Sequence, residues 1–240
     1  MTQLPPVDQA RLCQVNRRLR ELYGVPQPFP PADPLDELIA TILSQNTADR
    51  NSERAWQRLR ARYRCWEEVL DADPEELYEV IKPAGLGRIK AQRIQAVLDV
   101  VRRQRGCFEL GFLCRLPLEE ARQWLCALPG VGPKTAACVL CFACGLPALP
   151  VDTHVYRVSR RLGLIPAGVS VEAAHRLLEG ALPAQDVFAF HINMIRHGRQ
   201  ICQARRPRCE RCALSDLCAY YATWQRTTQE PEAAGLHATE

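Results

Sequence analysis

The fold of this sequence is constrained most strongly by its helix start signals. No strand pattern accompanies them. Asp33-Pro34 and Asp73-Pro74 each place a capping side chain before a proline, which suits the first position of a helix. Apolar residues follow both pairs at helical spacing, and no segment alternates with the two-residue period of a strand. We expect Gly180 to end a helix over 171–179. The pattern predicts an all-α protein, with further helices at 50–63, 88–104, 118–127, 133–144, 153–162 and 185–198.

Two proline-containing stretches predict where the chain divides. With 240 residues and 47% hydrophobic content, the chain can build a packed core in one large or two small domains. The Pro-rich stretch 26–34 and the segment GLPALP at 145–150 are expected boundaries. After Trp224 the sequence is polar and has no apolar face, so we expect a disordered tail.

The expected cellular compartment decides whether the cysteines are reduced or paired in disulfides. No apolar run near the start resembles a secretory signal, and the apolar stretch 136–151 is too short to span a bilayer. We therefore expect a cytoplasmic protein, in which the twelve cysteines stay reduced as core residues or metal ligands. Cys138, Cys141 and Cys144 recur every three residues in an apolar helix, which favours core packing over a metal site.

A second group of cysteines has metal-ligand spacing. Cys202, Cys209, Cys212 and Cys218 are separated by six, two and five residues in polar, Arg- and Pro-containing loops. Four thiols in so short a segment have no packing rationale, so they predict a metal centre. Both a four-cysteine zinc site and a [4Fe-4S] cluster remain open, and the single Cys-x-x-Cys pair favours the cluster.

Arginines are concentrated around these four cysteines. The net charge of +4 is by itself weak evidence for a nucleic-acid partner. Arg205, Arg206 and Arg208, however, lie between the first two cysteines, where a cluster could hold them as a phosphate-facing finger. A solvated basic face is the alternative.

The stretch GVGPKT, residues 130–135, predicts a phosphate-binding hairpin. It is not a P-loop, because Pro133 precedes the lysine. A helix that ends near Leu128, a turn through Gly130 and Gly132 and a new helix from Pro133 form a helix-hairpin-helix. Glycines allow close approach of a DNA backbone, and the free N–H groups of the new helix favour a phosphate.

Lys134 and Asp152, eighteen residues apart, are the candidate catalytic pair. Lys134 falls in the first turn of a helix, where the positive end of the dipole favours the neutral amine. Such an amine could attack a sugar carbon and form a Schiff base, or the lysine could only neutralise a phosphate. Asp152 is placed to cap the next helix, and a carboxylate fixed in this way could also stabilise positive charge on a deoxyribose.

Taken together, these motifs resemble the endonuclease III family of DNA glycosylases, in the helix-hairpin-helix superfamily. The resemblance covers roughly residues 8–222 and is carried by three segments. These are LPGVGPKTA, VDTHVYRV and HGRQICQARRPRCERCALSDLC, with weaker matches at LSQNTADRN and IKPAGLGRIKAQRI.

The resemblance implies roles for individual residues. Lys134 is the implied Schiff-base lysine and Asp152 the implied catalytic aspartate. The implied DNA contacts are Gly130, Val131 and Gly132 at a phosphate, Gln45, Asn46 and Leu86 in the gap left by a flipped nucleotide, and His154 near the opened strand. The implied ligands of a [4Fe-4S] cluster are Cys202, Cys209, Cys212 and Cys218.

The resemblance also implies an architecture and an activity. It implies two helical lobes with a DNA-binding cleft between them. One is a six-helix barrel with the hairpin over 28–145, and the other is a cluster lobe of 1–27 and 146–224, leaving 225–240 as the tail. The implied activity is removal of oxidised pyrimidines from double-stranded DNA, followed by strand cleavage, by a monomer.

Some residues depart from the family pattern. Pro133, the segment Gln45-Asn46-Thr47-Ala48 and the long segment CFELGFLCRLPLEE are the main differences, and the last two bear on lesion preference. Adenine-removing relatives lack the lysine and carry a glutamate in the helix that here reads LIATILSQ, so the lyase interpretation is favoured. A non-catalytic iron-sulfur DNA-binding protein and a glycosylase for a different lesion are the alternatives.

Overall fold

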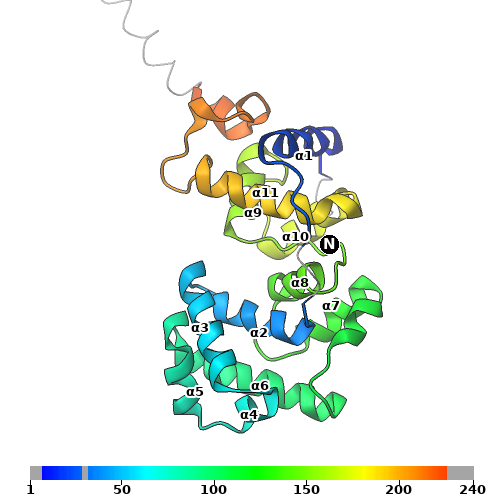
Figure 1. Cartoon of the computed structure of the whole chain (residues 1–240). Coiled ribbons are helices and arrows are strands. Elements are labelled where there is room, and N and C mark those ends of the chain that lie inside the picture. Colours follow the sequence, from blue (N-terminus) through cyan, green and yellow to red (C-terminus); the bar gives the residue numbers. More distant parts are fainter. Residues whose placement is uncertain (1–6, 29–31, 226–240) are drawn as a thin grey trace, which may run out of the picture. The chain divides into compact units, whose positions relative to one another are not determined.

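The computed structural model describes residues 7–28 and 32–225, and every regular element within them is a helix. Figure 1 shows these helices along the chain. The all-α prediction is therefore confirmed. The predicted disordered tail, 225–240, lies outside the described residues except for Gln225. None of the helices in these ranges is both long and apolar enough to cross a membrane.

The chain divides into two compact units. One consists of Met1–Gln27 and Leu149–Glu240, and the other of Pro28–Ala148. We call them the split unit and the central unit. The helices of the central unit are α2 (Pro34–Ser44), α3 (Asp49–Arg62), α4 (Trp66–Asp71), α5 (Pro74–Ile81), α6 (Gly87–Arg105), α7 (Leu118–Cys126) and α8 (Pro133–Phe142), with 3₁₀ turns at Lys82–Ala84 and Gly111–Arg115.

Two of these helices begin at the Asp-Pro pairs that the sequence identifies. The Asp33 carboxylate accepts the N–H of Leu35 at 2.8 Å, and Asp73 accepts the N–H of Glu75 at 2.9 Å. A side-chain cap of this kind stabilises a helix by about 1 kcal/mol. Helix α2 then packs against α3, α6 and α8, and its leucines and isoleucines are fully buried. The central unit is thus built around α2, with α8 against it.

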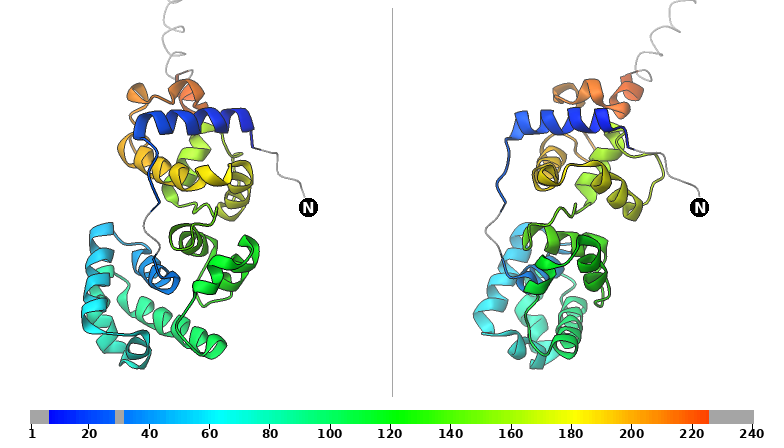
Figure 2. Two further views of the ribbon diagram at one scale, coloured as in Figure 1. Left: turned by 45° about the vertical axis from the view of Figure 1, so that its right-hand side comes forward. Right: turned by 90° about the vertical axis from the view of Figure 1, so that its right-hand side faces the viewer.

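The split unit joins the N-terminal helix to the C-terminal part of the chain. Its helices are α1 (Gln9–Tyr23), α9 (Thr153–Leu162), α10 (Val171–Ala181) and α11 (Val187–Gln200), with 3₁₀ turns at Ala184–Asp186, Cys209–Arg211 and Ser215–Leu217. Helix α11 packs against both α1 and α9, and Figure 2 shows α1 alongside these helices.

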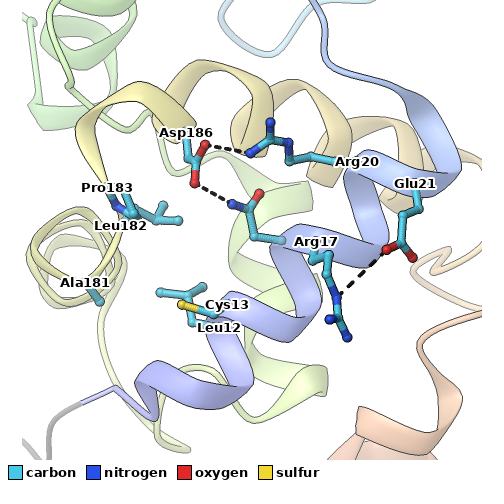
Figure 3. Close-up of a pocket in the computed structure, with 10 residues that line it drawn as sticks. Leu12, Cys13, Arg17, Arg20, Glu21, Ala181, Leu182, Pro183 and Asp186 are labelled. Carbon is cyan, nitrogen blue, oxygen red and sulfur yellow. Dashed lines mark hydrogen bonds and ion pairs between the residues drawn. The ribbon is translucent and has the colours of Figure 1, made fainter.

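Polar contacts fix α1 in the split unit. The Asp186 carboxylate accepts hydrogen bonds from Asn16 Nδ2 at 2.9 Å and from Arg20 Nη1 at 3.0 Å (Figure 3). Asn16 and Arg20 of α1 line a cavity of about 420 Å³ together with Leu182, Pro183 and Asp186 (Figure 3). One carboxylate thereby links a helix from the start of the chain to the beginning of α11.

Three helix predictions need correction. Gly180 lies inside α10, which ends at Ala181, because Leu182 and Pro183 stop the helix: a residue before proline is driven to extended backbone. Helix α8 ends at Phe142, two residues earlier than predicted. Helix α4 was missed because Cys65, before it, supplies no side-chain cap and the helix has only six residues.

The prediction for Cys144 is only partly confirmed, because Cys144 packs against the core of the central unit but is neither helical nor reduced. Cys138 and Cys141 are buried in α8, as core packing requires, but Cys144 lies beyond the helix and forms a disulfide with Cys114. The Cα atoms of the pair are 4.7 Å apart, within the usual range for a disulfide. The bond ties the long segment before α7 to the end of α8. The expectation that every cysteine is reduced therefore fails for this pair.

Candidate functional site

The helix-hairpin-helix consists of α7, the hairpin that follows it and α8. Gly130 has φ +70°, a conformation that favours glycine, and the N–H of Val131 donates to the Leu128 carbonyl at 3.2 Å. Gly132 is the N-cap of α8 and offers no side chain to the first turn, which leaves the free N–H groups there to another acceptor. The Val131 side chain is buried in the core, so only its backbone is available to a phosphate.

Arg93 of α6 contacts both the hairpin at Gly130 and the side chain of Gln45. A Cβ on Gly130 would lie 2.8 Å from Arg93 Cδ, so the arginine packs directly over the glycine. Arg93 Nη1 donates to Gln45 Oε1 at 2.6 Å, and Gln45 Nε2 donates to Thr135 Oγ1 at 3.1 Å. These bonds bring Gln45 next to the residue that follows Lys134. Sequence patterns gave no signal for Arg93, which is one of several arginines on α6.

Lys134 is half-buried at the second position of α8 and faces a carboxyl group that sequence reasoning missed. Glu37 of α2 accepts a hydrogen bond from Thr41 Oγ1 at 3.0 Å. Burial raises the pKa of Glu37, while the hydroxyl of Thr41 and the charge of Lys134 partly lower it. The packing of α2 against α8 thus puts a carboxyl within electrostatic reach of Lys134.

Asn46 and Leu86 are presented in an unusual backbone conformation. Their φ angles are +52° and +49°, and they are the non-glycine residues with positive φ in the described chain. Asn46 is exposed, and Leu86 is 58% exposed, despite its large apolar side chain. Gln45, by contrast, is held by Arg93 and Thr135. Of the three residues, Gln45 therefore has a fixed side-chain amide, whereas the side chains of Asn46 and Leu86 are exposed.

Asp152 lies in the split unit, where it caps α9. Its Oδ1 accepts the N–H of Val155 at 2.7 Å, so the predicted capping role is confirmed. His154 follows in the first turn, and its Nδ1 lies 3.1 Å from Arg157 Nη2. Burial lowers the pKa of His154, which favours the neutral ring at pH 7, and Asp152 partly opposes this shift. The structure therefore fixes the Asp152 carboxyl and keeps a neutral imidazole two residues away.

The four downstream cysteines line one small cavity in the split unit. Cys202, Cys209, Cys212 and Cys218 share it with Arg161 and His197. Burial raises the pKa of Cys212 to about 11, and burial together with the neighbouring thiols raises the pKa values of Cys209 and Cys218. Four thiolates here would need a positive centre to offset their charge, which is chemistry that a metal centre supplies. In the described part of the chain, no group of three or more His, Cys, Asp or Glu side chains is already arranged around a metal position.

Arginines hold the start of this cysteine segment on α9. Arg161 donates to the carbonyls of Gln203 at 2.7 Å and Ala204 at 2.9 Å, and its Nη1 lies 3.4 Å from Cys202 Sγ. Arg157 Nε donates to the Cys202 carbonyl at 3.1 Å. Sequence reasoning missed both residues, because their partners lie about forty positions away.

The arginines of the cysteine loop remain exposed. Arg205, Arg206 and Arg208 are all exposed, and the first and last of them line a groove with Tyr220 and Trp224. Exposed guanidinium groups beside aromatic rings suit a phosphate backbone, and they also suit a solvated face.

Comparison with known proteins assigns the family. Residues 39–184 match the model of the HhH-GPD superfamily base excision DNA repair proteins. Endonuclease III of Thermotoga maritima is 39% identical over 189 residues, which cover 79% of this chain and 84% of the relative.

Solved structures give the same assignment. A trapped covalent intermediate of endonuclease III with DNA has a TM-score of 0.79 at 31% identity, covering 92% of this chain and 100% of the other. A thermostable thymine-DNA glycosylase has a TM-score of 0.72 at 28% identity, covering 89% and 98%. The chain belongs to the HhH-GPD superfamily of base excision DNA repair proteins, within its endonuclease III family.

Proposed function

We propose that this protein is a bifunctional DNA glycosylase and AP lyase that removes oxidised pyrimidines from double-stranded DNA. The observation that carries the proposal is the setting of Lys134. It follows a glycine hairpin suited to a phosphate, it adjoins a residue bonded to Gln45, and it has Glu37 within electrostatic reach. A lysine that only neutralised a phosphate would need neither the anchored amide nor the carboxyl.

In the proposed reaction, Lys134 Nζ attacks C1′ of the damaged nucleotide as the bond to the base breaks. The base leaves with the electron pair and takes up a proton, while Nζ, now bonded to C1′, loses a proton. The Nζ lone pair then breaks the C1′–O4′ bond, O4′ takes up a proton, and a protonated Schiff base forms between C1′ and Nζ. Loss of a proton from C2′ then breaks the C3′–O bond and cuts the strand. Asp152 stabilises the positive charge that develops on the sugar as the base departs.

The DNA contacts complete the proposal. The hairpin backbone at Gly130, Val131 and Gly132 holds one phosphate. Gln45, Asn46 and Leu86 occupy the gap left by the flipped nucleotide, and His154 lies near the opened strand. The basic loop residues Arg205, Arg206 and Arg208 bind the backbone elsewhere on the duplex. We propose that the protein acts as a monomer on DNA in the cytoplasm.

The four downstream cysteines are the proposed ligands of a [4Fe-4S] cluster. Cys202, Cys209, Cys212 and Cys218 line one cavity, and their spacing, with a single Cys-x-x-Cys pair, favours the cluster over a zinc site. The cluster, when bound, would serve as a cross-link that fixes the basic loop. Visible absorption and an iron assay test this assignment: a colourless protein with one zinc per chain would contradict it.

Borohydride trapping tests the catalytic proposal. The wild-type protein should form a covalent complex with abasic-site DNA, because borohydride reduces the Schiff base. Lys134→Ala should abolish the complex while still binding DNA, and Lys82→Ala, at an exposed lysine of the same unit, should leave it unchanged. DNA binding by the wild-type protein without any trapped complex would exclude the lyase activity and leave a non-catalytic binding protein.

The substrate class is tested separately, because the similarity to a thymine-DNA glycosylase favours a second candidate. Single-turnover cleavage should be measured on duplexes that contain oxidised pyrimidines, oxidised purines or thymine opposite guanine. The proposal expects the fastest base removal with oxidised pyrimidines. Preference for mispaired thymine would support the second candidate.

A further inference from the structure

Two exposed turns of the central unit share one buried lysine. The first turn, Gln45–Thr47, carries Asn46, and the second, Ala84–Leu86, carries Leu86, with both residues in the left-handed conformation. For a side chain such as leucine this conformation is strained. Such backbone persists only where the surrounding contacts determine it, which raises the question of what holds these two turns.

Lys90 makes these contacts. It lies in the first turn of α6, only 2% exposed, and its Nζ donates to three oxygens. These are the Leu43 carbonyl at 2.7 Å, Thr47 Oγ1 at 2.7 Å and the Ala84 carbonyl at 2.9 Å. An ammonium has three hydrogens, so all of its donors are used. Two of the acceptors flank Asn46 in sequence, and the third lies two residues before Leu86.

Thr47 reinforces the link between the turns. Its hydroxyl lies within hydrogen-bonding distance of the Ala84 carbonyl and 3.0 Å from the Gln45 carbonyl. Because a hydroxyl has one hydrogen, it donates to one of these carbonyls at a time while it accepts from Lys90. Lys90, Thr47 and Ala84 therefore form a closed polar triangle beneath the two exposed residues.

The energetics argue against a purely stabilising role for this lysine. Burial, and secondarily the charge of Arg93, lower the pKa of Lys90 to about 8. A charge kept in an enclosed site at such a cost often serves to fix a particular arrangement. Close to Lys90 in sequence, Leu86 and Ile89 are 58% and 54% exposed and have the spacing of one helical turn, so an apolar tip is exposed to solvent.

We propose that Lys90 is a positioning residue for DNA opening, which holds the Gln45–Thr47 and Ala84–Leu86 turns as one preformed tip. Asn46 and Leu86 then enter a damaged duplex together, without first having to order two separate loops. The inference rests on the proposed function, since it concerns the residues assigned there to the gap in the DNA. Preorganisation of this kind improves affinity by removing the ordering cost from the binding step.

The test measures binding of the full-length protein to a duplex that holds a tetrahydrofuran abasic analogue. This analogue cannot form a Schiff base, so the measurement is independent of Lys134. Lys90→Met should weaken binding to the analogue about tenfold and leave binding to undamaged duplex unchanged. The matched control is Lys82→Met, at an exposed lysine eight positions earlier, which should leave both affinities unchanged. A 2-aminopurine base placed opposite the analogue should unstack and become more fluorescent when the wild-type protein binds. Binding of Lys90→Met should not produce this increase.

A double-mutant cycle separates positioning from general loss of structure. If Lys90 acts through Asn46 and Leu86, adding Lys90→Met to the double variant Asn46→Ala/Leu86→Ala should not weaken binding to the analogue any further. Additive losses would overturn the proposal. Trapping at saturating abasic DNA should keep its rate, so that the defect is confined to binding.

Two further measurements keep the outcome decisive. Should Lys90→Met fail to fold, Thr47→Val removes one side of the triangle and should weaken binding to the analogue in the same selective way. Unchanged binding by Thr47→Val and Lys90→Met would refute the inference. If the wild-type protein shows no preference for the analogue over undamaged duplex, the proposed function itself fails, which distinguishes the two failures.

Discussion

At the scale of single residues, the site depends on half-buried polar groups whose partners lie far away in the sequence. Arg93 packs over Gly130 and bonds to Gln45, and Glu37 lies within electrostatic reach of Lys134. Arg93 and Glu37 lie in helices whose sequences indicate only an apolar face and a polar face. Their significance comes from the residues that they meet.

The pairing of Glu37 with Lys134 predicts a pH-dependent stability. Burial raises the folded-state pKa of Glu37 above its unfolded value, so its ionisation opposes folding. The wild-type protein should therefore lose stability relative to Glu37→Gln as the pH rises from about 4.3 through the folded-state pKa. Lys134→Met removes an opposing charge and should extend this loss to higher pH. Urea unfolding at several pH values measures both effects.

An exposed carboxylate provides the control for this prediction. Glu109→Gln, at an exposed position of the same unit, should follow the wild-type pH profile. A Glu37→Gln profile parallel to that of the wild type would show that the Glu37 carboxyl titrates as it does in the unfolded chain.

At the scale of elements, α9 connects the candidate aspartate with the cysteine segment. Asp152 caps its first turn, Arg157 bonds to the Cys202 carbonyl, and Arg161 bonds to Gln203 and Ala204. Arg161 also lies 4.9 Å from the ring of Tyr220. One helix of ten residues therefore carries a carboxyl at one end and holds the metal-ligand loop at the other.

Loss of the Arg161 contacts should loosen the proposed cluster. Arg161→Met removes two hydrogen bonds to the backbone of the cysteine segment, and changes next to metal ligands typically cost 10- to 100-fold in affinity. We expect the visible absorbance of the reconstituted protein to decay about tenfold faster under a chelator. Arg160→Met, at the exposed neighbouring position, should decay at the wild-type rate. Equal rates for the two variants would contradict the holding role of Arg161.

At the scale of the whole molecule, the chain forms two units, each with its own buried core. The central unit contains the hairpin, Lys134 and the disulfide, whereas the split unit contains Asp152 and the four downstream cysteines. The catalytic proposal therefore distributes its two catalytic groups over both units.

The Cys114–Cys144 disulfide should stabilise the central unit alone. It closes a loop with a sequence separation of 30 that contains α7, the hairpin and α8. The chain-entropy model for a loop of this size gives about 3.6 kcal/mol. Cys114→Ser should lower the free energy of unfolding of this unit by about that amount, measured by urea unfolding, and leave the cluster absorbance of the split unit unchanged.

Reduction offers an independent check of the disulfide. A thiol reductant should destabilise the wild-type protein to the level of Cys114→Ser and have no further effect on that variant. Cys107→Ser, at an exposed free cysteine, should keep the full response. Insensitivity of the wild-type protein to reductant would show that Cys114 and Cys144 are unpaired in solution.

The sequence by itself determined the features that depend on neighbouring residues. The capped starts of α2 and α5 at Asp33 and Asp73, the glycine hairpin before Lys134 and the all-α class follow from local chemistry within a few positions. The four downstream cysteines can likewise be recognised as a group from their spacing, because residues in one short loop must lie close in space.

The tertiary structure decided the contacts between residues far apart in the chain. Gln45 meets Thr135 across 90 positions, Lys90 reaches Leu43 across 47, and Cys114 pairs with Cys144 across 30. Helical periodicity shows which face of a helix is apolar, but it does not specify which helices pack together or at what register. For that physical reason only the packed helices reveal that α2 and α6 hold the hairpin, present Leu86 and place Glu37 near Lys134.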